Sequence, residues 1–320
     1  MPDAERLVSD DAGPGGAAPL PHDPADPLGL EVEARRAELV VLDPTMSAAE
    51  AFATIADECV EHWRTNESRL RTTRSVRHLH QTRVGIRRLR SAFSLFGPLT
   101  RQVPGAVLVA HRLRALAMPF GAARDLDVLL IGPLAERLDE AQRARLMEDR
   151  ETAYDAVLAI LHSPEWATTR SDLDALLAGS AGWPEGGPVR DVARAALEKR
   201  SRRVVGTLDR LPSMTPADRH RVRIEAKKLR YGCEFFSALF PAREPRVVVD
   251  EEGTVLTGAL AHAWLVEEVQ TALGALNDHA TADALLHRVG ESAPAVDAEE
   301  LLAEGIAAVE RLAAVEPFWR

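Results

Sequence analysis

The 320-residue sequence predicts an all-α fold built as a pseudo-symmetric pair of helical bundles. Only 5% of the residues are aromatic, whereas alanine, leucine, glutamate and arginine are abundant. Straight-chain residues of this kind lose little rotamer freedom in a helix. No stretch shows the alternation of apolar and polar residues that is typical of a half-buried strand. A charged motif occurs twice, 140 residues apart, which indicates an internal duplication.

The N-terminal part of the chain combines a tail, a short apolar run and a capped helix. Residues 1–30 are rich in proline, glycine, alanine and aspartate, without periodicity, which predicts a disordered tail. The apolar run at residues 39–42 predicts a strand-like lead-in. Ser47 and Glu50 have the spacing of a capping box, so a helix is expected from there to about Leu70.

Helical periodicity then continues through both halves of the chain. In the first half it covers residues 76–99, 102–120, 126–162 (where Gly132-Pro133 can break it) and 165–177. In the second half it covers residues 189–211, 216–240, 255–276, 281–289 and 297–315. Glycine and proline cluster at residues 179–188, which predicts a hinge or inter-domain loop. We therefore expect a first bundle over residues 31–182 and a second over residues 183–320.

The charge of the chain is acidic overall but unevenly distributed. The formal net charge is −10, yet residues 64–124 hold 13 arginines and a single acid. Residues 190–230 hold 13 basic residues and five acids. Binding follows the local potential rather than the net charge. Because the chain has two basic territories, its acidic net charge does not exclude a polyanionic ligand.

The sequence also predicts a compartment. Its two cysteines, Cys59 and Cys233, do not form a disulfide framework and fit a reducing environment. The acidic N-terminus lacks the pattern of a secretory signal, and no apolar run reaches the length of a membrane span. We expect a cytoplasmic protein without a membrane partner.

The repeat consists of two matches that occur in the same order. The pattern His-x-x-Arg-x-x-x-basic-basic-Leu-Arg starts at His80 and again at His220. A pattern Gly-Ala-x-x-Asp ends at Asp125 and again at Asp278, at an offset of 153 residues. The longer offset falls on a loop-like insert around residues 250–254. Two collinear matches favour duplication of a whole unit.

Helical geometry places the charged residues of each copy on one face. Positions 0, +3, +7 and +10 fall within about 80° of one another at 100° per residue. This face carries His80, Arg83, Arg87 and Arg90 in the first copy and His220, Arg223, Lys227 and Arg230 in the second. Ile86, Leu89, Phe93 and Phe96 form the opposite, core side. Like charges at such spacings repel by about 0.2–0.5 kcal/mol per pair, so we expect an anion to complete the face. Solvated surface arginines are the alternative.

These residues resemble the CHAD family, the conserved histidine α-helical domain. Its hallmarks are the first His/Arg helix, a second copy ending Lys-Leu-Arg-Tyr, and the segment Gly-x-x-Arg-Asp-x-Asp-Val, which is present here from Gly121 to Val128. The resemblance covers roughly residues 45–315. It implies two four-helix bundles about a pseudo-twofold axis, with the basic helices facing a shared central cleft or pore. It also implies binding of inorganic polyphosphate. From the duplicated cationic face we expect this binding to be non-catalytic and to target the protein to polyphosphate granules.

The resemblance assigns the polyphosphate-binding residues by their place in the motifs. They are His80, Arg83, Arg87, Arg88, Arg90, Arg114, Arg124, His220, Arg223, Lys227, Lys228, Arg230 and Tyr231. Arginine offers a planar fork that matches phosphate oxygens, and lysine offers a mobile point charge. A row of such groups suits a linear polyanion.

Other functions remain as alternatives. The same basic territories would suit a nucleic-acid or other polyanion-binding module, although stacking aromatic residues are lacking near the face. Asp125, Asp127 and Asp278 are candidate metal ligands, but a structural role of Asp125, as an ion pair with Arg124 or as a helix cap, is favoured. We expect no catalytic residues, no metal and no cofactor, because no paired catalytic carboxylates or phosphate-binding loop is present. A phosphoryl-cleaving enzyme is thus the least favoured reading.

Overall fold

The computed structural model describes residues 33–240, 248–249 and 255–320. The chain is all-helical, as predicted, apart from one pair of two-residue antiparallel strands in the described part, β1 (Val248–Val249) and β2 (Val255–Leu256). The predicted disordered tail, residues 1–30, and the insert at residues 250–254 lie outside the described residues. Within the described part, no helix combines the length and the apolar character needed to cross a membrane.

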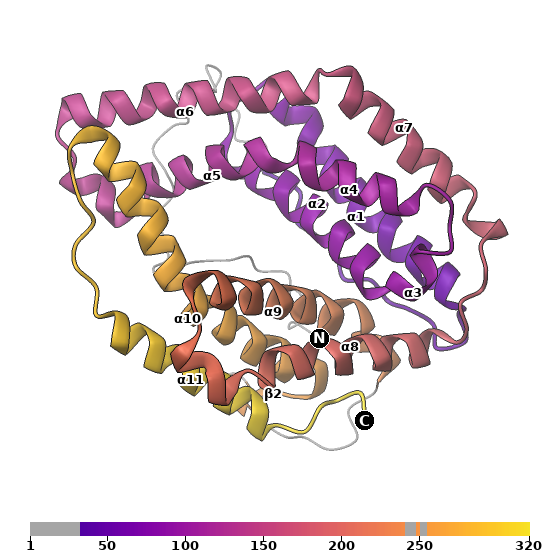
Figure 1. Cartoon of the computed structure of the whole chain (residues 1–320). Helices are drawn as coiled ribbons and strands as arrows, with labels where there is room; N and C mark the ends of the chain where they lie inside the picture. Colours follow the sequence, from indigo (N-terminus) through magenta and orange to yellow (C-terminus); the bar gives the residue numbers. More distant parts are fainter. Residues whose placement is uncertain (1–32, 241–247, 250–254) are drawn as a thin grey trace.

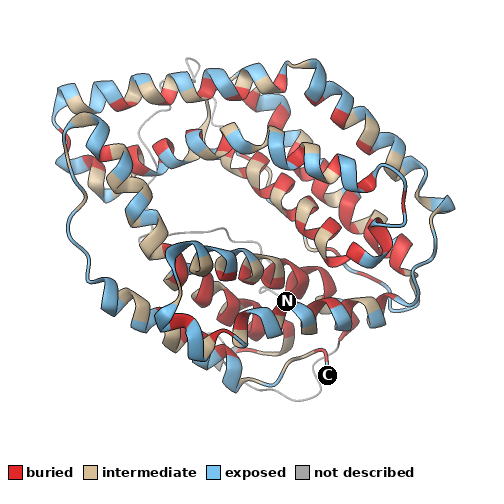
Figure 2. Cartoon of the chain, viewed as in Figure 1, coloured by how far each residue is buried: buried red, intermediate tan, exposed pale blue. Residues whose placement is uncertain are grey.

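The helices form two groups that follow each other along the chain (Figure 1). The first group comprises α1 (Ala48–Leu70), α2 (Val76–Leu95), α3 (Gly97–Thr100), α4 (Ala106–Leu116), α5 (Met118–Ile131), α6 (Glu140–Leu161) and α7 (Pro164–Ala178), with the 3-10 helices η2 (Pro133–Arg137) and η3 (Ser180–Gly182). The second comprises α8 (Val189–Val205), α9 (Pro216–Phe236), α10 (Gly258–Leu286) and α11 (Ala298–Ala314), with η4 (Leu208–Ser213), η5 (Ser237–Leu239) and η6 (His287–Val289). The helices α6 and α7 form an outer edge and turn much of their surface to solvent (Figure 2).

The first helix begins where the capping box predicts. Ser47 accepts the Glu50 backbone N–H, and the Glu50 carboxylate accepts the Ser47 backbone N–H at 2.8 Å. The start of α1 is also tied to the predicted hinge, because the backbone N–H of Ala48 donates to the carbonyl of Gly187 at 2.9 Å. Gly187 has a φ of 86°, a conformation that favours glycine. The loop between the groups is therefore fastened to the first helix.

The apolar run at residues 39–42 is not a strand. It has no regular structure, and it places Val40 and Leu42 in the core while Val41 is exposed. Its side chains are buried alternately, as those of a strand are, but no described segment pairs with it. The strand-like prediction is therefore wrong.

Two helix boundaries also differ from the prediction. One helix was expected to end at residue 120, yet α4 ends at Leu116 and α5 begins at Met118. Pro119 explains the shift, because proline fits the first turn of a helix and cannot continue one. A break was expected between residues 276 and 281, yet α10 (Gly258–Leu286) runs through this stretch. Its polar residue Asn277, which interrupts the apolar pattern of the sequence, lines a cavity. The expected break at Gly132-Pro133 is confirmed by η2.

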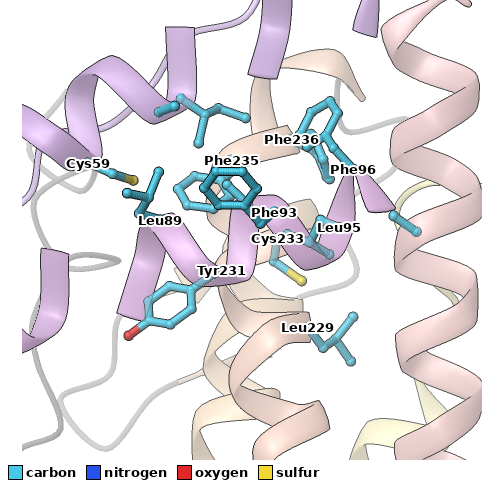
Figure 3. Packing of buried hydrophobic residues seen from close by; sticks show 14 of the residues in the cluster. Cys59, Leu89, Phe93, Leu95, Phe96, Leu229, Tyr231, Cys233, Phe235 and Phe236 are labelled. Carbon is cyan, nitrogen blue, oxygen red and sulfur yellow. The ribbon is translucent and has the colours of Figure 1, made fainter. Parts of the chain in front are cut away.

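The main core lies where α2 meets α1 and α9 (Figure 3). Gly85 of α2 allows α1 to approach closely, because a Cβ at this position would lie 2.8 Å from the Cβ of Trp63. Phe96 and Phe236, which are equivalent in the sequence repeat, meet edge to face with ring centroids 5.6 Å apart. Such pairs stabilise a fold by about 0.5–1.5 kcal/mol beyond the contribution of burying their surface. The two groups of helices thus share one core.

A buried histidine makes stability depend on pH. His262 of α10 is packed against Trp319, with ring centroids 4.8 Å apart, and burial lowers its pKa to about 4. The unfolded chain binds a proton near pH 6.5, so stability is lost as the pH falls from about 6.5 towards 4.

We expect the unfolding free energy to be roughly 2 kcal/mol lower at pH 4.5 than at pH 7 through this group alone. Urea unfolding of the wild type and of His262→Phe at both pH values measures the difference, because phenylalanine cannot take up the proton. Parallel pH profiles for the two proteins would contradict the assignment.

Candidate functional site

A cavity of about 1190 Å³ lies between the two groups of helices. Residues of α2, α3, α4 and α5 from the first group line it, together with residues of α8, α9 and α10 from the second. Among the described residues, its lining includes eleven arginine and lysine side chains and two carboxylates, those of Asp125 and Asp191. Like charges are thus gathered in one concave site of a chain whose net charge is −10.

Both copies of the repeated motif contribute to this cavity. The predicted residues that line it are Arg83, Arg87, Arg90, Arg114, His220, Arg223, Lys227 and Lys228. The pKa of Arg90 is lowered, first by burial and then by the charge of the nearby Arg114. The described residues that line the cavity do not include His80, Arg88, Arg124, Arg230 or Tyr231. The two copies therefore contribute unequally.

The structure explains why the Gly-Ala-x-x-Asp segment accompanies both copies of the His/Arg motif. In the first copy, Arg83 Nη1 donates to the carbonyls of Phe120 and Gly121, at 3.1 and 3.2 Å. In the second copy, Arg223 lies against Gly274, where a Cβ would be 2.9 Å from its Nε and Nη2. Each motif arginine thus packs on the glycine of the Gly-Ala-x-x-Asp segment. The glycines leave room for the guanidinium groups.

We expect Gly274→Ala to displace the Arg223 guanidinium without unfolding the protein. The added Cβ meets the flexible end of a side chain, and alanine favours the helix by about 1 kcal/mol over glycine. Polyanion affinity should fall about tenfold, the scale of one charge-assisted contact. Gly121→Ala is the matched control, since its Cβ would lie 3.7 Å from Arg83 Nη1, an ordinary contact. Equal affinities of the two variants in a binding titration would refute the expectation.

Tyr231 lies beneath the cavity and orients Arg87. The tyrosine is buried, and its hydroxyl accepts a hydrogen bond from Arg87 Nε at 2.7 Å. The Arg87 guanidinium also lies over the ring, 5.7 Å from its centroid. Arg87 itself lines the cavity. Tyr231 therefore holds a cation in place and does not reach the cavity.

Arg88 and Arg230 are core residues. Arg88 is only 2% exposed and pairs with Glu234 of α9. Arg230 is 4% exposed and pairs with Glu267 of α10 at 2.9 Å. Arg88 follows Arg87 by 100° around the helix, which points it at α9 instead of the cavity. Arg230 shares the face of the other motif residues, but the acids near it draw it inward.

The remaining predicted residues are not among the described residues that line the cavity. His80 and Arg124 are half-buried. The charge of Arg83 lowers the pKa of Asp125 more than that of Arg124, the expected partner, does. That pKa is nevertheless raised, first by partial burial and then by the charge of Asp278.

The other two candidate metal ligands pair with arginines. Asp127 is buried and accepts hydrogen bonds from Arg150 Nε at 2.7 Å and from the Tyr154 hydroxyl at 2.8 Å. Asp278 lies 3.5 Å from Arg223 Nη2. Among the described residues, no three histidine, cysteine or acidic side chains come together in a group suited to a metal.

The cavity also holds cations that the repeat did not identify. They are Arg101, Lys199, Arg200 and Arg203, with His111 beside them in the lining. The charge of Arg200, then burial and the charges of Arg203 and Arg101, lower the pKa of Lys199. All four cations belong to the two basic territories of the sequence. They have no counterpart in the repeated motif, which is why a search for repeats passes over them.

The comparisons with known proteins agree with the resemblance. The sequence profile described as the CHAD domain matches residues 54–287. A crystal structure of the CHAD domain from the plant Ricinus communis is 27% identical, with a TM-score of 0.67 over 88% of this chain and 92% of that one. PptA from Streptomyces chartreusis is 16% identical, with a TM-score of 0.46 over 85% of this chain and 97% of that one, which is too distant to carry an argument. No curated protein sequence matches significantly.

Proposed function

Because this chain belongs to the CHAD domain family, we propose that it binds inorganic polyphosphate in the cavity, without catalysis. The family is associated with polyphosphate binding. The observation that carries the proposal for this chain is that eleven basic side chains and two carboxylates line the cavity, counted over the described part of the chain. Cations gathered in one cavity repel one another and gain from an anion that lies among them.

The chemistry of the lining suits a long, regular chain of phosphates. Arginine and lysine bind phosphate oxygens through charge-assisted hydrogen bonds, and each occupied phosphate releases counterions. Ten of these cations lie on α2, α4, α8 and α9, and Arg101 follows α3, so they surround the cavity. A linear polyanion can meet many of them at once, whereas a single phosphate meets few.

We also propose that residues 31–182 and 183–320 are pseudo-symmetric four-helix bundles that share this cavity through the duplicated His/Arg/Lys face. The contact of Phe96 with its equivalent, Phe236, supports an axis between α2 and α9. The two arginine–glycine contacts, at Gly121 and Gly274, give further support. Polyphosphate granules are the expected place of action.

A titration with polyphosphate of defined length tests the function. We expect the logarithm of the affinity to fall linearly with the logarithm of the salt concentration, with a slope that grows with the number of phosphates bound. RNA and DNA of equal charge are the competitors that represent the alternative ligand. Equal or better binding of nucleic acid would overturn the proposal, as would magnesium-dependent release of phosphate.

A further inference from the structure

Three cations of the cavity form a group outside the repeated motif. Arg101, Lys199 and Arg203, called the α8 cluster below, all line the cavity and are exposed. Lys199 and Arg203 are one turn apart on α8, and Arg101 follows the short helix α3. The α8 cluster therefore brings charges from two elements to one part of the cavity.

The α8 cluster carries excess positive charge. Neither Arg101 nor Lys199 forms an ion pair with any residue that the structure describes. Arg203 lies 3.1 Å from Glu225, but this carboxylate also pairs with Arg200 at 2.6 Å and with Lys228 at 2.7 Å. One acid shared by three cations cannot neutralise them, so an anion would be favoured at the α8 cluster.

The α8 cluster continues the row of cations on α2. Arg200 Nη2 donates to the backbone and side-chain oxygens of Ser94, both at 2.9 Å, and so fixes α8 beside the turn that follows Arg90. The eleven residue steps from Arg83 to Ser94 span about 16 Å at 1.5 Å per residue. A ligand that lies along Arg83 and Arg90 must extend beyond them to reach Lys199.

We propose that the α8 cluster is a second anion-binding subsite, which polyphosphate occupies only when its chain is long enough to continue past Arg90. The inference rests on the proposed function and adds a preference for long chains over short ones. Short phosphates find their contacts on the repeated face, and longer chains gain the contacts of Arg101 and Lys199 in addition.

Removal of two charges from the α8 cluster tests the inference. In the full chain, Arg101→Gln with Lys199→Gln should weaken binding of a polyphosphate of about 100 phosphates about tenfold and lower the salt dependence. Affinity for tripolyphosphate should change by less than about twofold. Arg137→Gln with Arg145→Gln is the matched control. Both arginines are exposed and do not line the cavity, and their substitution removes the same amount of charge.

The outcomes separate the subsite from the function. Long-chain affinity equal to that of the control variant would overturn the second subsite and leave polyphosphate binding standing. An equal loss for long and short chains would also overturn it, because the cations would then serve every ligand. An unmodified protein that binds no polyphosphate of either length would overturn both the function and the subsite.

Discussion

Arg87→Glu combined with Lys227→Glu is expected to lower polyphosphate affinity by about 100-fold or more. Both side chains line the cavity, one from each copy of the motif. The double variant replaces two attractive charges with two repulsive ones, so each phosphate nearby loses a contact and gains an unfavourable neighbour. A titration at fixed salt with chains of defined length measures the loss, and circular dichroism checks that the helices remain.

A variant with the same change of net charge separates local from global effects. Arg137→Glu with Arg145→Glu alters two exposed arginines outside the cavity. Its affinity should fall far less, because exposed charges more than about 10 Å away are screened at ordinary salt. Retained binding in the Arg87/Lys227 variant, or an equal loss in the control, would place the ligand elsewhere.

Glu234→Gln is expected to lower the free energy of unfolding by about 3–5 kcal/mol, because it leaves the buried Arg88 without its principal counter-charge. Both side chains are almost fully buried, and Glu58, the other acid near Arg88, is more distant at 3.7 Å. Urea unfolding monitored by circular dichroism gives the change.

Two comparison variants make this expectation specific. Glu268→Gln removes one partner of an exposed pair with Arg311, whose N–O distance is 3.0 Å, and should cost less than about 1 kcal/mol. Arg88→Met with Glu234→Leu removes both buried charges and should recover much of the loss. A cost for Glu234→Gln as small as that of Glu268→Gln would show that the buried pair is not needed.

The sequence predicts the parts of the fold that depend on local chemistry. The capping box at Ser47 and the break at Pro133 appear in the structure. Helical spacing also places Arg83, Arg87 and Arg90 on one side of α2, and all three line the cavity. Such features depend on residues within a turn or two of each other, so periodicity and capping suffice to find them.

Features that depend on partners distant in sequence could not be predicted in the same way. The motif predicts the same role for Arg88 and Arg230 as for the arginines beside them. In the structure both are buried, because they form ion pairs with acids on α9 and α10. Lys199 joins the site only because the fold brings α8 next to α2. Spacing along one helix reveals a face, whereas its neighbours decide whether that face meets solvent, ligand or core.

The loop that joins the two groups of helices has a consequence for the order in which the chain can fold. The backbone N–H groups of Ala48 and Ala49 donate to the carbonyls of Gly187 and Glu185, at 2.9 and 3.1 Å. During synthesis α1 therefore emerges early, but its first turn is completed only once residue 187 has left the ribosome. Contacts of such long sequence separation form late. The start of α1 thus gains these two partners only after the whole first group of helices has been synthesised.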